Sequence, residues 1–201
     1  MTEQASLKLN AEGKEQSIDL PMVVGTEQER AIDIASLRAK TGLVCLDPAF
    51  MNTASTTSGI TFLDGEQGIL RYRGYPIEQL GQHASFVEVC YLLIYGNLPN
   101  AKELEKFTTS LTRHSLLHED MKRFFDGYPS TAHPMAILSS MVCSLSSYYP
   151  DSLDVNNKGE IDITIARLLA KVPTIDAFSY KKSVGQPFVY PQTHLDYDSP
   201  F

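Results

Sequence analysis

The 201-residue chain has few cysteines and no long hydrophobic run. Cys45, Cys90 and Cys143 are far apart and lie among apolar residues, which favours reduced thiols over a disulfide framework. The longest apolar stretch, residues 135–145, is interrupted by serines and is shorter than the roughly 20 residues that span a bilayer. Residues 1–13 are polar and show no signal-peptide pattern. We therefore expect a cytoplasmic protein with no membrane partner.

The chain also has fewer basic than acidic residues. Seventeen lysines and arginines stand against 24 aspartates and glutamates, and the formal net charge is −7. This balance argues against nucleic acid as a partner but leaves room for a local anion site. The chain lacks a glycine-rich phosphate loop, a nucleophile elbow and a Cys-x-x-Cys pair. Ser179-x-x-Lys182 resembles a serine–lysine motif whose companion motifs are missing. We therefore expect no catalytic residue within this chain.

His114 and His118 are four residues apart, and this histidine pair is the only motif in the sequence that suggests a metal-binding site. Such a pair can bind zinc when both side chains share a helix face. The zinc-protease pattern needs glutamate directly after the first histidine, and that position is Ser115. Both histidines also continue the apolar stripe of a predicted helix that begins near Leu104. Packed histidines are therefore the favoured interpretation, and we expect no metal site.

The first third of the chain predicts strands. Short alternating or apolar runs occupy residues 6–9, 17–24 and 43–46. Two further alternating runs, 60–63 and 70–73, flank an Asp-Gly-Glu-Gln-Gly loop whose residues tolerate positive φ. These two runs therefore predict a β-hairpin.

From Pro76 onward the hydrophobic period becomes helical. Ser85-x-x-Glu88 and Asn100-x-x-Glu103 are capping boxes that begin two helices, and apolar residues on all sides of the first predict that it is buried nearly all round. Further helices are expected at 134–149, at 158–171 with an end before Pro173, and in a last stretch that ends at Gly185. The predicted fold class is mainly α, with β-rich residues 1–75 followed by helical residues 76–201.

Arg167 and Lys171 lie four residues apart in one predicted helix, on the face that also holds Thr164. Like charges at this spacing destabilise a helix by roughly 0.2–0.5 kcal/mol. Neither has an acidic residue three or four positions away to offset the repulsion. Two interpretations stay open, a solvated surface pair or a face that binds an anion such as phosphate.

Residues 59–80, Gly-Ile-Thr-Phe-Leu-Asp-Gly-Glu-Gln-Gly-Ile-Leu-Arg-Tyr-Arg-Gly-Tyr-Pro-Ile-Glu-Gln-Leu, resemble the signature that opens the body of citrate synthases. The likeness continues in residues 112–114, 133–135, 151–157 and 183–191. Together these segments resemble type II citrate synthases of Gram-negative bacteria, hexameric enzymes with a β-rich amino-terminal region and a large helical body. The resemblance implies that the helices here are the first of the family's large domain, so that the fold is incomplete.

The resemblance implies an acyltransferase that condenses acetyl-CoA with oxaloacetate to give citrate and CoA at the entry to the tricarboxylic acid cycle. The family's catalytic aspartate and two histidines belong to its second half, so this chain alone is expected to be inactive. No cofactor is implied, and a homo-oligomer from dimer to hexamer is expected. A genuine short regulatory or assembly subunit, which binds NADH or a full-length synthase, is the alternative. A 2-methylcitrate synthase is a more distant one.

Many type II enzymes are inhibited by NADH at a site formed largely by the half present here. In that site the cation pair would hold the phosphates, the tyrosine would stack or donate a hydrogen bond, and the glutamine would offer a free amide at a helix end. Serine replaces the family's threonine and Thr193 its asparagine, so weakened rather than lost binding is expected. By resemblance the allosteric site maps onto Arg113, His114, Ser115, Tyr149, Arg167, Lys171 and Gln186.

Overall fold

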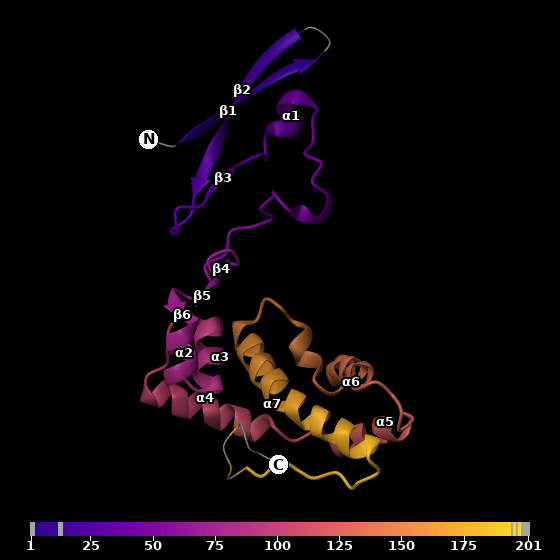
Figure 1. Cartoon of the computed structure of the whole chain (residues 1–201). Helices are drawn as coiled ribbons and strands as arrows, with labels where there is room; N and C mark the ends of the chain where they lie inside the picture. The colour runs from indigo at the N-terminus through magenta and orange to yellow at the C-terminus, as the bar shows by residue number, and fades with distance from the viewer. Residues whose placement is uncertain (1–2, 12–13, 194, 196, 198–201) are drawn as a thin grey trace. The chain divides into compact units, whose positions relative to one another are not determined.

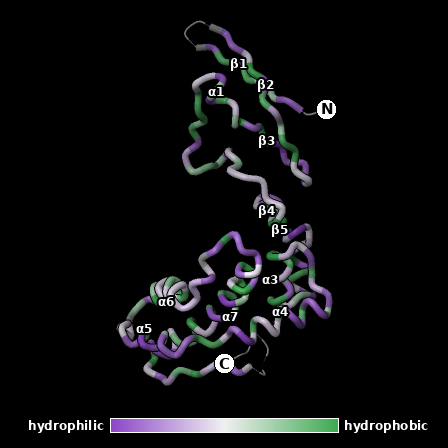
Figure 2. The backbone as a smooth tube through the Cα atoms, turned by 180° about the vertical axis from the view of Figure 1, so that it is seen from behind, coloured by the Kyte–Doolittle hydropathy of each residue, from purple (hydrophilic) through white to green (hydrophobic). Residues whose placement is uncertain are grey.

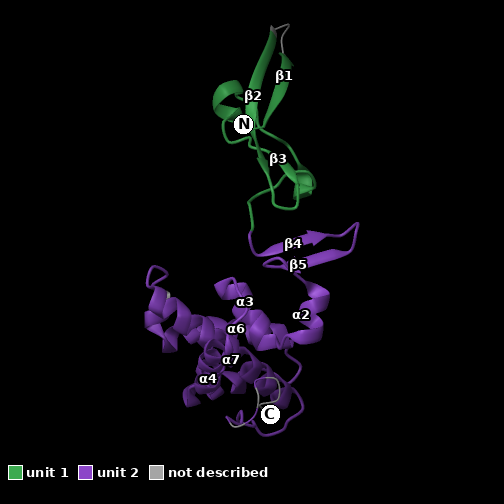
Figure 3. Cartoon of the chain, turned by 90° about the vertical axis from the view of Figure 1, so that its left-hand side faces the viewer, with its two compact units in different colours: residues 1–58 green, residues 59–201 purple. Residues whose placement is uncertain are grey.

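The computed structural model describes residues 3–11, 14–193, 195 and 197. The chain divides into two compact units, residues 1–58 and 59–201 (Figure 3). A small β-rich region precedes a mainly helical body (Figure 1), which confirms the predicted fold class. Across the described residues, no helix combines the length and apolar character that crossing a membrane requires.

The first unit is built on a three-stranded antiparallel sheet in the order β1-β2-β3. Residues that alternate along a strand share one face of a sheet, and on β2 Ile18 and Leu20 share the face that packs on Leu37 of α1 (Leu37–Thr41). These three residues form the small core of the unit. The strands are β1 (Gln4–Ala11), β2 (Lys14–Val24) and β3 (Arg30–Ile32).

The strand predicted at residues 43–46 does not form. This run has no regular structure and no partner strand, and Val44 and Leu46 are 68% and 90% exposed. It leads into the 3-10 turn η1 (Pro48–Phe50), where Ala49 has a φ of 69°. An apolar run becomes a strand only when a neighbouring strand can pair with it, and the prediction was wrong because sequence does not show that neighbour.

The predicted β-hairpin is present at the start of the second unit. Strands β4 (Thr61–Asp64) and β5 (Ile69–Tyr72) pair antiparallel, and the short β6 (Tyr75–Pro76) extends the sheet. The Asp64 carboxylate accepts hydrogen bonds from two backbone N–H groups of the loop at 3.0 and 2.9 Å. Gly68 closes the loop with a φ of 70°, a conformation that glycine adopts without a steric penalty.

Both predicted capping boxes are formed. The Ser85 hydroxyl accepts a hydrogen bond from the Glu88 backbone N–H, and the Glu88 carboxylate accepts one in return from the Ser85 N–H at 2.7 Å. Asn100 and Glu103 make the same reciprocal pair. The first three helices of this unit are α2 (Ile77–His83), α3 (Phe86–Tyr95) and α4 (Ala101–His114).

Helix α3 is not buried nearly all round, contrary to the prediction. Val87 and Leu92 are buried, but Phe86 is 54% exposed. Helix α4 packs against α3, and Ala166 and Ala170 join the same cluster, yet Tyr95 at the other end of α3 is also 40% exposed. Apolar residues on every side of a helix show that each side can be buried, but they do not show that a packing partner for each side is present.

The segment predicted as two helices around Pro173 is one continuous helix, α7 (Lys158–Ser183). Proline lacks the N–H that would bond the carbonyl four residues earlier, which is the Leu169 carbonyl. The Tyr197 hydroxyl donates a hydrogen bond to that oxygen at 2.7 Å. A donor far along the chain thus replaces the lost helical bond, so the proline does not end the helix.

Helix α7 joins two hydrophobic clusters. Ala166 and Ala170 belong to a cluster with α3 and α4. Ile175 and Phe178 belong to a larger cluster with α5 (Lys122–Asp126) and α6 (Pro134–Tyr148). Pro173 lies between the two pairs. The remaining elements are the 3-10 turns η2 (Glu119–Met121) and η3 (Pro150–Leu153).

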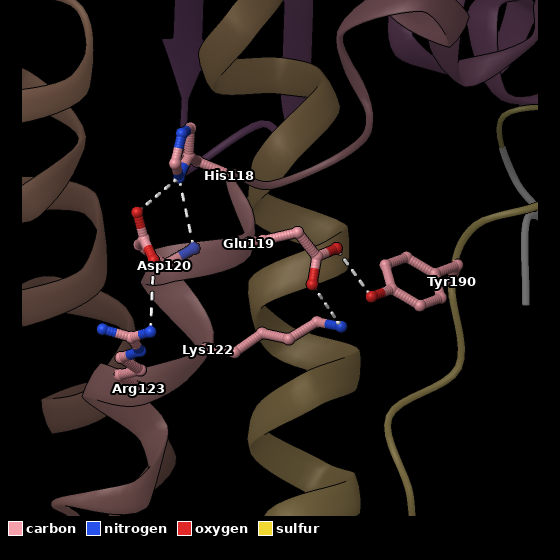
Figure 4. A network of polar contacts seen from close by, with 6 residues as sticks. All are labelled: His118, Glu119, Asp120, Lys122, Arg123 and Tyr190. Carbon is pink, nitrogen blue, oxygen red and sulfur yellow. Dashed lines mark hydrogen bonds and ion pairs between the residues drawn. The ribbon is translucent and has the colours of Figure 1, made fainter.

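The segment after α7 turns back along the helices (Figure 1). The Phe188 ring stacks on Phe178 with centroids 4.5 Å apart. The Tyr190 hydroxyl donates to the Glu119 carboxylate at 2.7 Å, and Lys122 pairs with Glu119 at 2.9 Å while lying 4.1 Å from the Tyr190 ring centroid (Figure 4). These contacts, with the Tyr197 bond, hold the segment against both halves of α7.

Replacement of Tyr197 by phenylalanine tests the proposed repair of the helix at Pro173. The loss of one hydrogen bond to a carbonyl that has no helical donor should lower the free energy of unfolding by about 1–2 kcal/mol. Urea unfolding of wild type, Tyr197→Phe, Pro173→Ala and the double variant measures the interaction energy.

In the Pro173→Ala background the restored N–H can bond Leu169, so the effect of Tyr197→Phe should fall below about half its wild-type value. Phenylalanine retains a ring that can stack on Phe86, where the centroids are 5.7 Å apart in wild type. Equal effects of Tyr197→Phe in both backgrounds would contradict the link between the tyrosine and the proline.

Candidate functional site

Three of the residues predicted for an allosteric site meet where α6 ends against α7. The Arg167 guanidinium lies 4.4 Å from the centroid of the Tyr149 ring, and the Lys171 ammonium lies 5.3 Å from it. Both distances are within the range of a cation–π interaction. Lys171 is only 2% exposed and Arg167 is half-buried, so the pair is not a solvated surface pair.

Lys171 ties α7 to the end of α4. Its Nζ donates to the backbone carbonyls of His114, at 2.8 Å, and of Leu116. The last carbonyls of a helix have no partner within it, and α4 ends at His114. An ammonium has three N–H donors; two bond these carbonyls, and the charge also lies within cation–π range of the Tyr149 ring.

The surroundings of Lys171 disfavour its charged form. Burial is the main cause, and the nearby Arg167 charge adds to it; together they lower the pKa of Lys171 from 10.5 to about 8. A buried cation next to a second cation is stabilised by an anion more than by any neutral ligand. The electrostatics of the cluster therefore favour a negatively charged ligand.

Two N–H donors of Lys171 are bonded to carbonyls, whereas Arg167 still has an N–H donor without a partner in the described structure. One of its terminal nitrogens donates to the Ser152 hydroxyl at 3.3 Å, but its Nε is buried and has no hydrogen-bond partner among the described residues. The same holds for the Thr164 hydroxyl and one carboxylate oxygen of Glu160. Buried polar atoms are normally satisfied by protein or by water, so this face of α7 has unmet polar capacity.

Ser115, His114 and Arg113 lie at the end of α4. The Ser115 hydroxyl donates to the Thr112 carbonyl at 2.9 Å, and the His114 Nδ1 is 2.8 Å from the Ser110 carbonyl. Both side chains are thus engaged within their own helix. Arg113 is exposed, and with His114 it lines an open depression on the outer side of α4.

Gln186 lies at the other end of α7. Its side-chain oxygen accepts a hydrogen bond from Lys181 at 2.9 Å, so its amide is not wholly free. Lys171 and the last helical residue, Ser183, are 12 residues apart, which is a rise of about 18 Å. Only an extended ligand could contact both Lys171 and Gln186.

The two histidines considered for zinc do not share a helix face. Helix α4 ends at His114, and His118 is instead the N-cap of η2, where its Nδ1 accepts from the Asp120 N–H at 3.2 Å. The predicted continuation of the α4 stripe through His118 was wrong, because the chain leaves the helix before that residue.

The sequence interpretation missed Ser152, Thr174 and Glu160. The Thr174 hydroxyl donates to the Ser115 carbonyl at 2.8 Å and so forms a second tie between α7 and the end of α4. A signal was available, because residues 160, 164, 167, 171 and 174 are polar and spaced at four and three, the period of one helix face. Nothing comparable marks Ser152, which lies in a 3-10 turn.

Comparison with known proteins gives a consistent picture. The family described as "Citrate synthase, C-terminal domain" matches residues 49–201. Citrate synthase 1 of Mycobacterium tuberculosis, in strains CDC 1551 / Oshkosh and ATCC 25618 / H37Rv, is 56% identical over 178 residues, which are 89% of this chain and 41% of that protein. The chain thus spans less than half the length of the curated relatives it matches.

Solved structures agree on the fold. Citrate synthase from Pyrobaculum aerophilum has a TM-score of 0.67 at 30% identity, covering 80% of this chain and 43% of that one. The enzyme from Thermotoga maritima MSB8 has a TM-score of 0.66 at 26% identity, covering 78% and 40%. A ternary complex of the Thermoplasma acidophilum enzyme with carboxymethyl coenzyme A and oxaloacetate, 22% identical over 73% of this chain and 38% of that one, has a TM-score of 0.66 and adds support for the fold alone.

The replacement Lys171→Met tests the buried cation through the pH dependence of stability. The folded lysine has a pKa of about 8 against an ordinary 10.5, so the unfolded chain binds more protons between these values. This side chain therefore raises the free energy of unfolding as the pH rises from 8 to 10.5, and methionine removes that rise. Urea unfolding at several pH values between 7 and 10.5 measures it.

The exposed lysine Lys106 on α4 provides a matched control, since Lys106→Met should leave the pH profile as in wild type. A stability difference between wild type and Lys171→Met that is the same at every pH, or that moves against wild type as the pH rises, would show that Lys171 does not titrate as a buried ammonium.

Proposed function

Because the chain belongs to the citrate synthase family, we propose that it is the amino-terminal part of an enzyme that condenses acetyl-CoA with oxaloacetate to give citrate and CoA. The observation that carries this proposal is 56% identity to citrate synthase 1 over 89% of the chain. The chain matches only 41% of that relative's length. The substrates and the reaction are therefore proposed for the protein to which this part contributes.

We further propose that the chain is inactive by itself. The condensation needs a base for the thioester methyl group and donors for the developing enol and for the oxaloacetate carbonyl. Three of the five histidines have local structural roles, since His118 and His133 cap turns of helix and His114 bonds its own helix. Those contacts support a scaffold role for this part.

Regulation by NADH is the second element of the proposal. The support is the cluster of Tyr149, Arg167 and Lys171, where two cations flank one ring and a buried guanidinium nitrogen has no partner in the described structure. The ring could stack on a planar group of the ligand, and Arg167 could donate to a phosphate. Gln186 and Arg113 would contact only the distal parts of an extended dinucleotide.

The type II class, a homohexameric assembly and a cytoplasmic location complete the proposal. The class and the assembly rest on the resemblance in residues 59–80 and 183–191. The location rests on the reduced thiols expected from the sequence, and Cys45, Cys90 and Cys143 form no disulfide. Light scattering of the purified protein, alone and with the rest of the enzyme, measures the assembly.

Replacement of Arg167 by alanine is the most direct test of NADH binding. Because Lys171 is committed to the α4 carbonyls, Arg167→Ala should weaken NADH binding at least tenfold, about 1.4 kcal/mol, with little change in thermal stability. Isothermal titration calorimetry of the 201-residue chain with NADH gives the affinity, and far-UV circular dichroism follows the melting transition.

Arg123→Ala is the matched control, because that side chain is 84% exposed on α5, away from the cluster, and pairs with Asp120 at 3.8 Å. It should bind NADH as wild type does. Unchanged affinity in Arg167→Ala, or an equal loss in both variants, would contradict a site at Tyr149, Arg167 and Lys171.

The proposed inactivity is tested by mixing the purified chain with acetyl-CoA and oxaloacetate and measuring free thiol release. No release above the buffer rate is expected. Citrate formation by the chain alone would overturn the assignment of the catalytic residues to another part of the enzyme. NADH binding without any synthase partner in the source cell would instead favour a separate regulatory subunit.

A further inference from the structure

The outward face of α4 carries a row of cations, which we define as Lys102, Lys106 and Arg113. They lie at i, i+4 and i+11, a spacing that places side chains on one face of a helix, and all three are exposed. The opposite face of α4 packs through Phe107 and Leu111 in the cluster with α3 and α7. Figure 2 shows hydrophilic residues, in purple, recurring along α4. The row has a length of about 16 Å, or three helical turns.

This row lines an open depression with a volume of about 440 Å³. Thr109 and Ser110 contribute hydroxyl groups between the cations, and His114 closes one end. In the part of the chain that the structure describes, the lining holds three cations and one carboxylate, that of Glu105. The depression therefore has an excess of two positive charges, although the whole chain has a net charge of −7. Its volume is that of a small-molecule site, and its charge favours a polyvalent anion.

The cations of the row have no anionic partner within the protein. The ion pairs among the described residues join other side chains, and none of them includes Lys102, Lys106 or Arg113. Lys102 and Lys106 are four residues apart, a spacing at which like charges on a helix repel each other. An anion bound between them would remove this repulsion, whereas a neutral ligand would not.

The end of α4 does not oppose an anion beside Arg113. The carboxyl-terminal end of a helix normally repels anions, because its last carbonyls have no partner within the helix. Here Lys171 donates to the His114 carbonyl at 2.8 Å, and the Ser115 hydroxyl donates to the Thr112 carbonyl at 2.9 Å. The ammonium of Lys171 also brings a positive charge to this end. The bonded carbonyls and the nearby ammonium thus leave a favourable potential for an anion.

We propose that the depression on α4 binds a chain of linked phosphates, with the row of Lys102, Lys106 and Arg113 as its cationic contacts. Ammonium and guanidinium groups bind phosphate oxygens through charge-assisted hydrogen bonds. A single phosphate can neutralise the cations of about one turn, whereas two or three linked phosphates extend along successive turns of the row. The site goes beyond the proposed function and does not depend on it, because Lys102 and Lys106 lie outside the cluster at Tyr149.

Isothermal titration calorimetry of the 201-residue chain with inorganic tripolyphosphate tests the site. A magnesium-free buffer of low ionic strength is needed, because salt screens exposed charges. Wild type should bind tripolyphosphate at least tenfold more tightly than inorganic phosphate. Lys106→Glu places a carboxylate in the middle of the row and should weaken tripolyphosphate binding at least tenfold. Because Lys106 is exposed, the melting temperature of this variant should equal that of wild type.

Lys158→Glu is the matched control, since it makes the same change of charge at an exposed lysine that begins α7 and lies outside the depression. It should bind tripolyphosphate within twofold of wild type. Lys102→Glu should repeat the loss seen in Lys106→Glu, which assigns binding to the row rather than to one side chain.

Guanosine triphosphate carries the same three linked phosphates and identifies their source. Affinity equal to or weaker than that of tripolyphosphate assigns the site to free polyphosphate, and tighter binding assigns it to a nucleotide. Three results overturn the proposal: no binding of tripolyphosphate by wild type, equal affinity in Lys106→Glu and wild type, or an equal loss in Lys158→Glu, which would reflect total charge alone.

Competition with NADH separates this site from the proposed regulatory site. NADH should not displace tripolyphosphate from wild type, and Arg167→Ala should bind tripolyphosphate as wild type does. Displacement by NADH would assign the depression to the dinucleotide and overturn a separate phosphate site. Failure of NADH to bind at all, with tripolyphosphate still bound, contradicts the proposed regulation and leaves the site on α4 supported.

Discussion

The helical unit depends on the burial of one ammonium group. Lys171 bonds the carbonyls of His114 and Leu116, so the end of α4 and the turn that follows it are fixed against the middle of α7. Removing a charge from water is unfavourable unless it is hydrogen-bonded, and the carbonyls and the Tyr149 ring provide that compensation. The chain can therefore leave the helix after His114, because the carbonyls of His114, Ser115 and Leu116 accept hydrogen bonds from Lys171 and Thr174.

A second constraint acts two residues further along the same helix, at Pro173. Pro173 interrupts the hydrogen bonds of α7 at the point where the helix passes from one hydrophobic cluster to the other. The donor that the proline lacks comes from Tyr197, and Thr174 bonds the Ser115 carbonyl beside it. The returning segment is thus part of the helix's own hydrogen bonding, and it is coupled to both clusters.

Local signals predicted most of the fold, and tertiary contacts account for what they missed. The capping boxes at Ser85 and Asn100 and the loop of the hairpin act within a few residues, so sequence alone sufficed. The helix through Pro173 could not be foreseen, because its replacement donor lies 28 residues along the chain from Leu169. In the candidate site, the absence of nearby acids singled out Arg167 and Lys171, but the bond from Lys171 to a carbonyl 57 residues away leaves no trace in spacing.

Lys171 and Arg167 differ in role because their N–H donors have different partners. Lys171 has bonded two carbonyls and lies beside a ring, so it acts on a ligand mainly through its charge. Arg167 repels it from four positions away on the helix and still has a buried Nε without a partner in the described structure. An anion at Arg167 would satisfy that donor and, by the same charge, reduce the repulsion that lowers the pKa of Lys171. The contact that stabilises α4 against α7 thus places a second, incompletely bonded cation beside Lys171, and in the proposed site a structural and a ligand-binding role would belong to neighbouring side chains of one helix face.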